Sequence, residues 1–228
     1  MLTELDKDRI AQAIEAAEQG TSGDVVCALT GEVSTYREVP LAWGAAVALT
    51  APPIALALGL RPLALAGQAG VWLAAQGAAL ENELAVTLGL YAVAQLMLFV
   101  AVALLVRVPQ VRRALTPRSL KSHRVDRAAR HHFTALAASA RGSETGVLIF
   151  VAVEDRQVRI LAAPSLHEKA DETAWTRAAN AIGAAMKAGH DPTRGIVEAI
   201  EICGAALKAH FPAAEGEAHA FSARPMDV

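Results

Sequence analysis

The chain lacks the short motifs that most often mark catalysis. It contains no phosphate-binding loop, no dinucleotide fingerprint and no Cys-x-x-Cys pair, and no Ser–His–Asp or Cys–His arrangement has motif support. Its two cysteines, Cys27 and Cys203, could pair in principle. In a reducing compartment we expect both to stay free and to pack as small apolar residues. Aromatic residues make up 4% of the chain and its net charge is −2, so we expect no nucleic-acid partner.

Charge is absent from two long apolar stretches, residues 41–60 and 84–106, which contain no Lys, Arg, Asp, Glu or His. At about 1.5 Å of rise per residue, a helix over either stretch is long enough to cross the roughly 30 Å hydrocarbon layer of a bilayer. We therefore predict a transmembrane hairpin over residues 39–108, with a kink or an unwound turn at Pro52–Pro53. Residues 63–80 are richer in glycine and polar residues, and we expect an interfacial helix or a partly inserted loop there.

Positive charge concentrates directly after the second span. Between Arg107 and Arg130 there are eight Lys or Arg residues and one acid, Asp126. Loops of this kind resist translocation, so this flank should be cytoplasmic, and the same charges would attract anionic lipid headgroups. We predict a multi-pass protein of the inner (plasma) membrane with both termini in the cytoplasm.

The residues before and after the hairpin, 1–38 and 109–212, alternate between helical and strand patterns, which is typical of an α/β domain. Thr3 and Asp6 form a weak capping-box pattern at the start of a first helix, and Gly20 is its expected end. Hydrophobic periodicity predicts a strand over 24–29, a helix over about 122–140, a strand pair over 145–153 and 157–162, and helices over about 171–188 and 190–210. Residues 213–228 are expected to be a disordered tail.

Three segments of the chain resemble the TPM-domain family. They are the opening LTELDKDRIAQAIEAAEQGTSGDVVCAL, the strand–turn–strand TGVLIFVAVEDRQVRIL and the closing AGHDPTRGIVEAIEICGAAL. The resemblance implies an α/β/α sandwich, and the position of the hairpin resembles a bacterial inner-membrane subgroup in which the spans follow the first strand. Strand 24–29 must then join strand 145–153 in one sheet, so both halves of the domain lie on one side of the membrane.

The same resemblance implies candidate chemistry. Family members that are phosphatase-like or bind divalent cations carry a Gly-aromatic-Gly-Leu-acid turn after the strand pair. The corresponding stretch here, Ala163-Pro164-Ser165-Leu166-His167, lacks both glycines and the acid, whereas close backbone approach to a phosphate or metal favours glycine. The candidate catalytic residues are Asp24 and Asp155, and the candidate metal ligands are Asp24, Glu154 and Asp155. A hard cation needs several oxygens at about 2.0–2.6 Å, and the alternative interpretation of Glu154 and Asp155 is a solvated turn.

Two functions follow as hypotheses. The first is a non-enzymatic interaction or assembly module without a cofactor, which contacts the lipid bilayer and an unidentified protein partner. Its spans could also form a homo-oligomer, with Gln95 bonding across the interface. The alternative is a membrane-anchored phosphatase-like hydrolase that depends on a divalent cation. Solute passage through an oligomer is least favoured, because neither span holds an ionisable residue.

Overall fold

The computed structural model describes residues 3–59, 80–139, 146–169, 172–188 and 191–213, together with residues 221 and 223–227. The chain divides into two compact units, of which the first consists of Met1–Thr35 and Pro117–Val228 and the second of Tyr36–Thr116. The predicted hairpin piece, 39–108, falls within the second unit. The predicted segment 63–80 lies, except for Leu80, outside the described residues.

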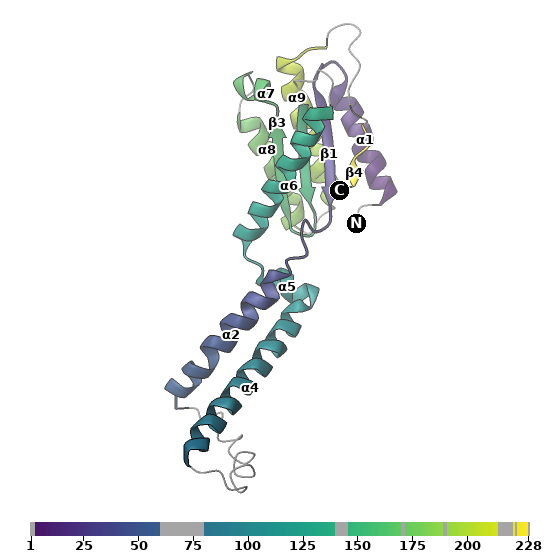
Figure 1. Ribbon diagram of the computed structural model, residues 1–228. Coiled ribbons are helices and arrows are strands. Elements are labelled where there is room, and N and C mark those ends of the chain that lie inside the picture. Colours follow the sequence, from purple (N-terminus) through teal and green to yellow (C-terminus); the bar gives the residue numbers. More distant parts are fainter. Residues whose placement is uncertain are drawn as a thin grey trace. The chain divides into compact units, whose positions relative to one another are not determined.

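The first unit is built on a four-stranded sheet in the order β3-β2-β1-β4 (Figure 1). Its strands are β1 (Asp24–Thr30), β2 (Gly146–Ala152), β3 (Gln157–Ala162) and β4 (Met226–Asp227). β1 and β2 pair in parallel, with Val26 opposite Leu148, and β2 and β3 form an antiparallel hairpin. The prediction that strand 24–29 joins strand 145–153 in one sheet is therefore confirmed, although the whole second unit separates them in the sequence.

Helices cover both faces of this sheet, as predicted for an α/β/α sandwich. Odd-numbered side chains of β1 and β2, such as Cys27 and Ile149, pack in one core with α1 (Glu4–Glu18), α8 (Glu172–Lys187) and α9 (Pro192–His210). Even-numbered ones, such as Val26 and Phe150, pack with Val125 of α6 (Arg118–Ser139) in a second core. Because both strands are buried on two faces, they are unbroken apolar runs in the sequence rather than alternating ones.

Two glycines of α9 allow this helix to approach its neighbours closely. A Cβ atom added at Gly204 would lie 2.6 Å from the Cβ of Ala17 on α1, and one added at Gly195 would lie 2.8 Å from the Cβ of Ala185 on α8. Carbon atoms do not approach this closely without strain, so the spacing of the three helices depends on glycine at both positions.

The second unit consists of α2 (Glu38–Ala57), α4 (Leu80–Arg107) and α5 (Pro109–Leu115) among the described residues. The prediction at Pro52–Pro53 is a kink or an unwound turn. The unwound turn is wrong, because α2 continues through both prolines. Pro52 has no N–H to bond the carbonyl of Ala48 four residues earlier. The side chain of Gln95 on α4 supplies that donor instead, with 2.9 Å between its Nε2 and the oxygen of Ala48. Gln95 thus donates a hydrogen bond within the chain.

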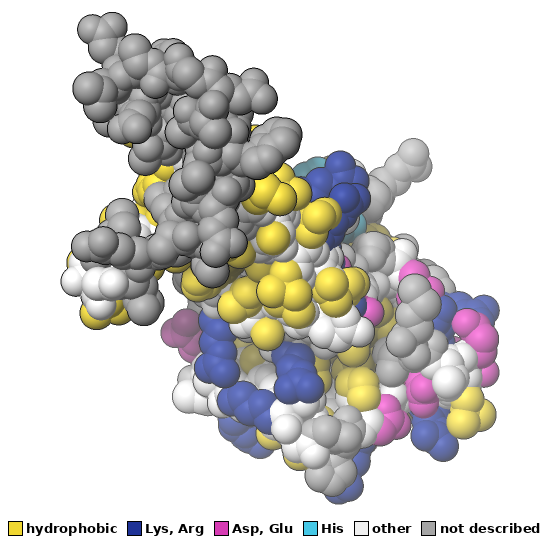
Figure 2. All heavy atoms as spheres, turned by 90° about the horizontal axis from the view of Figure 1, so that it is seen from below, with side chains coloured by type: hydrophobic (Ala, Val, Ile, Leu, Met, Phe, Trp, Pro, Cys, Tyr) yellow, Lys and Arg dark blue, Asp and Glu magenta, His cyan; other side chains and the backbone are white. Residues whose placement is uncertain are grey.

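Large apolar side chains face outward from these helices, and Figure 2 shows them in yellow. They include Leu49 (66% exposed), Leu96 (61%) and Leu105 (61%). Among the described residues, no single helix combines the length and apolar composition required of a membrane span. The bent pair Tyr91–Arg107 and Pro109–Leu115, with 97° between its members, meets this requirement by length and composition.

Three elements were not expected from the sequence: α5, α7 (Pro164–Lys169) and β4. Each is too short to show a periodic pattern, which is recognised over about 11–18 residues for a helix and about 4–8 for a strand. β4 departs from the predicted disordered tail (213–228) at residues 226–227, where Met226 and Asp227 pair in parallel with Ala28 and Leu29 of β1.

Candidate functional site

The three candidate acids lie at opposite ends of the sheet. Asp24 is the first residue of β1, whereas Glu154 and Asp155 follow the last residue of β2. β1 and β2 run parallel, with Asp24 opposite Gly146 and Thr30 opposite Ala152. The end at Asp24 and the end beside Glu154 are therefore at least six residue steps apart, or roughly 20 Å. Asp24 therefore lies far from Glu154 and Asp155, and the three candidate ligands do not converge on one point. Over the part of the chain that the structure describes, no group of three or more His, Cys, Asp or Glu residues is placed to hold a metal ion.

Asp155 is a buried anchor at the carboxyl ends of the parallel strands. Asp155 is only 4% exposed, and its Oδ2 accepts a hydrogen bond of 3.1 Å from the backbone N–H of Val33. The interpretation as a solvated turn is wrong for this residue, whereas the neighbouring Glu154 is exposed. Residue 33 belongs to the segment that leaves β1 toward the second unit, so Asp155 fixes the start of that connection.

Backbone hydrogen bonds join the same turn to the same segment. The N–H of Val153 donates to the oxygen of Thr30, and the N–H of Glu154 donates to the oxygen of Gly31, each over 2.9 Å. Arg156 closes the turn with a φ of 51°, a left-handed conformation that is uncommon for residues other than glycine. The acidic turn therefore extends the pairing of β1 and β2 beyond the strands themselves.

Arginine–serine pairs tie α6 to the rest of the first unit. Nη1 of Arg124 donates to Oγ of Ser34, and Nη2 of Arg159 on β3 donates to Oγ of Ser122. Nε of Arg159 also lies 3.7 Å from Oδ1 of Asp126. Guanidinium and hydroxyl groups are suited to binding phosphate, but the contacts of these residues fasten the first two turns of α6 and the loop after β1.

The other end of the sheet is closed by α7 and by the end of α9. Asp24 is 2% exposed, and the N–H of Val25 beside it donates to Oε1 of the buried Glu18 over 3.0 Å. The stretch 163–167, where the resemblance implies a glycine-containing turn, begins α7 instead, and the side chain of Leu166 is fully buried in the larger core. An apolar side chain thus occupies the place where a metal-binding or phosphate-binding turn was considered.

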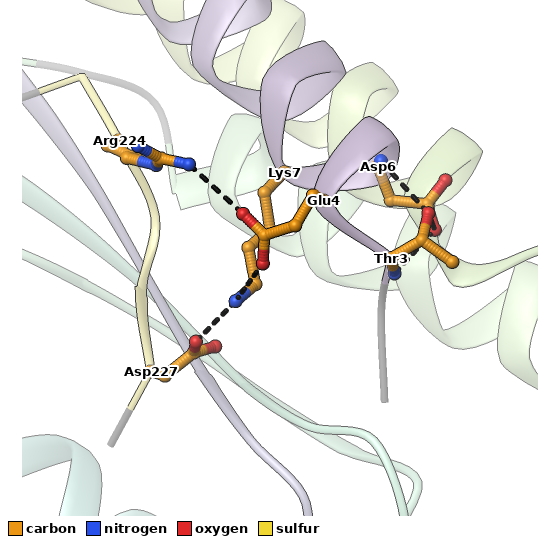
Figure 3. A network of polar contacts seen from close by, with 6 residues as sticks. All are labelled: Thr3, Glu4, Asp6, Lys7, Arg224 and Asp227. Carbon is orange, nitrogen blue, oxygen red and sulfur yellow. Dashed lines mark hydrogen bonds and ion pairs between the residues drawn. The ribbon is translucent and has the colours of Figure 1, made fainter.

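The C-terminal strand is held by a surface network of charges (Figure 3). Nζ of Lys7 on α1 lies 2.5 Å from Oδ2 of Asp227 and 3.1 Å from Oε1 of Glu4. Nη2 of Arg224 lies 3.0 Å from Oε2 of Glu4. The hydrogen bonds to Asp227 and then to Glu4 raise the pKa of Lys7 above its ordinary value. The contacts of Lys7 with Asp227 and of Arg224 with Glu4 could not be predicted from the sequence, because the partners of each are 220 residues apart.

A shallow groove of about 470 Å³ runs between α8 and α9. Ile202, Ala205 and Ala206 contribute an apolar surface, and Arg177, Glu201 and His210 contribute charged or polar groups. An open groove of this composition suits a protein segment better than a small substrate, which is usually held in a deeper cavity.

Neither cysteine is placed for nucleophilic chemistry. Both are free and buried, and burial raises the pKa of Cys27 and of Cys203 to about 12. A thiol with this pKa stays protonated at neutral pH and is a poor nucleophile. The expectation of two free, buried thiols is confirmed.

Comparison with known proteins supports the fold. The sequence profile of the TPM domain family matches residues 110–206, which include α6, β2, β3, α7, α8 and most of α9. The structure is similar to the NMR structure of BA42 protein from the psychrophilic bacterium Bizionia argentinensis, with a TM-score of 0.54 and 18% sequence identity. The similarity covers 100% of this chain and 96% of that chain. No curated protein matches the sequence.

Proposed function

We propose that this protein is anchored in a membrane by its second unit and that its TPM-like α/β domain acts as an interaction or assembly module at the cytoplasmic face. The observation that carries the proposal is the insertion of a unit with outward-facing apolar helices between two strands of one sheet. Removing a side chain such as Leu49 or Leu96 from water is worth about 1.5–3 kcal/mol, so a bilayer is a favourable environment for these surfaces.

The pairing of β1 with β2 constrains the topology of the proposed anchor. Both strands belong to the first unit, so the chain must leave and return on the same side of the membrane. An even number of crossings meets this condition, and α2 with α4 supplies two. The cationic residues that follow Arg107 favour the cytoplasm as the common side.

Anchoring is tested by extracting cell membranes with alkaline carbonate, which releases peripheral proteins. We expect the protein to stay in the pellet. A lysine in the hydrocarbon layer costs about 2.5–3.5 kcal/mol, so Leu96→Lys together with Leu49→Lys should reduce the membrane-bound fraction. Leu5→Lys is the matched control, because Leu5 is 62% exposed on α1 of the first unit and its substitution should change nothing. Release of the unaltered protein by carbonate would contradict the proposal.

The interaction role is supported by the groove between α8 and α9 and by the structural use of the acids. Asp155 already binds the backbone of Val33, and α7 occupies the position of the implied catalytic turn. A photo-crosslinking amino acid at Ala205 in the groove should yield a reproducible protein adduct in cells. The same substitution at Ala135, an exposed alanine of α6, is the control. Equal labelling from both positions, or none, would count against the groove as the interaction surface.

A phosphatase-like hydrolase is the second candidate, because Asp155 lies at the carboxyl ends of parallel strands, where α/β proteins commonly bind ligands. The purified protein should be assayed with phosphoester substrates, with and without Mg²⁺ or Ca²⁺. Cation-dependent activity that disappears in Asp155→Asn would favour this candidate over the interaction module. Activity that is unaffected by the substitution would assign it to another site or to a contaminant.

A further inference from the structure

A short helix is set across the end of the long helix in the second unit. α5 follows α4 after a single residue, Val108, and is bent by 97° from Tyr91–Arg107. In the proposed membrane arrangement α4 crosses the bilayer. A helix at right angles to α4 then runs along the membrane surface, where amphipathic helices bind lipid.

A tryptophan fastens this crossing helix to α2. Nε1 of Trp43 donates a hydrogen bond of 3.2 Å to the backbone oxygen of Leu115, the last residue of α5. The Trp43 side chain belongs to a residue that is still 39% exposed. Indole rings with one polar edge are favoured at the level of lipid headgroups. Trp43 therefore indicates that the end of the second unit near α5 lies at the headgroup level.

The charge at this end is positive. Arg107 ends α4 and Arg113 lies on α5, and both are exposed. Arg112 is a second cation on α5. Arg37, just before α2, and Glu38, its first residue, carry opposite charges. No Asp or Glu occurs in the sequence between residues 84 and 125. Val108, between the two helices, is 43% exposed and offers an apolar contact beside the arginines.

We infer that Arg107, Arg113, Val108 and Trp43 form a headgroup surface that binds the phosphate groups of anionic phospholipids. Guanidinium groups bind phosphate oxygens in pairs, Val108 and the indole ring reach the acyl boundary, and the 97° bend holds α5 in the plane in which headgroups lie. The inference rests on the proposed membrane anchoring and adds a lipid preference to it.

The test measures lipid binding to the full-length protein in detergent by native mass spectrometry. Phosphatidylglycerol and phosphatidylcholine with identical acyl chains are titrated separately. Near a charged membrane surface each arginine adds about 1 kcal/mol of attraction, which is about fivefold in affinity. Arg107→Gln with Arg113→Gln should therefore weaken phosphatidylglycerol binding by about 25-fold. Arg9→Gln with Arg194→Gln makes the same change in net charge on exposed positions of α1 and α9 and should leave binding unchanged.

A charge-preserving variant keeps the result interpretable. Arg107→Lys with Arg113→Lys should retain most of the preference for phosphatidylglycerol, which separates loss of charge from loss of folding. Equal binding of the two lipids to the unaltered protein would overturn the inference, as would equal weakening by the control pair. Either result would leave carbonate-resistant anchoring intact, so failure of the lipid preference is distinguishable from failure of the anchor.

Discussion

Pro52 removes one donor from the hydrogen bonds of α2, and Gln95 of α4 replaces it at 2.9 Å. The sequence alone placed both residues in apolar stretches but could not pair them, because the register of two helices depends on packing. Gly44 contributes to that packing, since a Cβ there would lie 3.1 Å from the ring of Phe99. In the proposed membrane arrangement an unpaired carbonyl would cost more in lipid than in water, which gives the glutamine a structural reason to lie in an apolar helix.

This pairing predicts a specific coupling between two substitutions. Gln95→Leu should destabilise the protein by about 1–2 kcal/mol, because the oxygen of Ala48 loses its donor. Pro52→Ala restores the backbone N–H of α2, so Gln95→Leu in that background should cost almost nothing. Reversible unfolding in mixed detergent micelles, followed by circular dichroism, measures all four proteins of the cycle. Equal costs in the two backgrounds would show that Gln95 does not satisfy this carbonyl.

Asp155 is a candidate catalytic or metal-binding residue from the sequence, and the structure gives it a partner, the backbone N–H of Val33, that the sequence could not show. Asp155→Ala should lower the thermal stability by about 1–3 kcal/mol, because the N–H of Val33 loses its acceptor. Asp155→Asn keeps one oxygen acceptor and should cost less. Glu154→Ala is the control at the exposed neighbouring position. A thermal scan in which Asp155→Ala and Glu154→Ala behave alike would remove the anchoring role.

At the scale of elements, long periodic segments were predicted well and short ones were missed. The capping box of Thr3 and Asp6 is complete, Gly20 ends the first helix region with a φ of 85°, and β3 has the predicted bounds. α6 begins at Arg118 rather than near residue 122, because the cationic residues after Pro117 have helical propensity but no apolar period. β4 escaped prediction because its position depends on contacts with β1 and α1.

The close approach of α9 to α1 predicts opposite effects for two glycines. Gly204→Ala should destabilise the protein by about 1–3 kcal/mol, because the new Cβ would lie 2.6 Å from that of Ala17 and 2.9 Å from its Cα. Gly183→Ala on α8 meets no atom within 4 Å and should be neutral or stabilising by up to about 1 kcal/mol. Thermal unfolding of the two variants provides the comparison, and similar destabilisation by both would contradict it.

The contacts of Lys7 predict that the stabilisation of β4 depends on pH. The folded-state pKa of Lys7 is raised above 10.5 by Asp227 and Glu4, so its stabilising contribution is present below that value and is lost as the pH rises through the raised pKa. Lys7→Gln should therefore speed amide exchange at residues 226–227 at neutral pH, and salt should weaken this stabilisation because the pairs are exposed. Lys187→Gln, at an exposed position of α8, is the control and should leave this exchange unaltered.

At the scale of the whole molecule, the sequence predicted that two distant pieces form one domain around an apolar insertion. The apolar runs at residues 24–29 and 145–153 are the basis of this prediction, and the parallel pairing of β1 with β2 confirms their association. The side chains that surround the candidate acids could not be predicted in the same way. Asp24 and Asp155 are both buried at sheet ends, and only strand direction and register reveal that these are different ends.

The most direct test of the central claim is the labelling of single introduced cysteines with a membrane-impermeant maleimide in intact spheroplasts and in inverted membrane vesicles. Cys27 and Cys203 are buried, so the label should report the introduced residues. Gln12→Cys on α1 and Asn180→Cys on α8 should both react in inverted vesicles and be protected in spheroplasts, whereas Gln68→Cys, between the two predicted spans, should show the reverse. Reaction of Gln12→Cys and Asn180→Cys from opposite sides of the membrane would contradict a single domain with a membrane hairpin inserted between its strands.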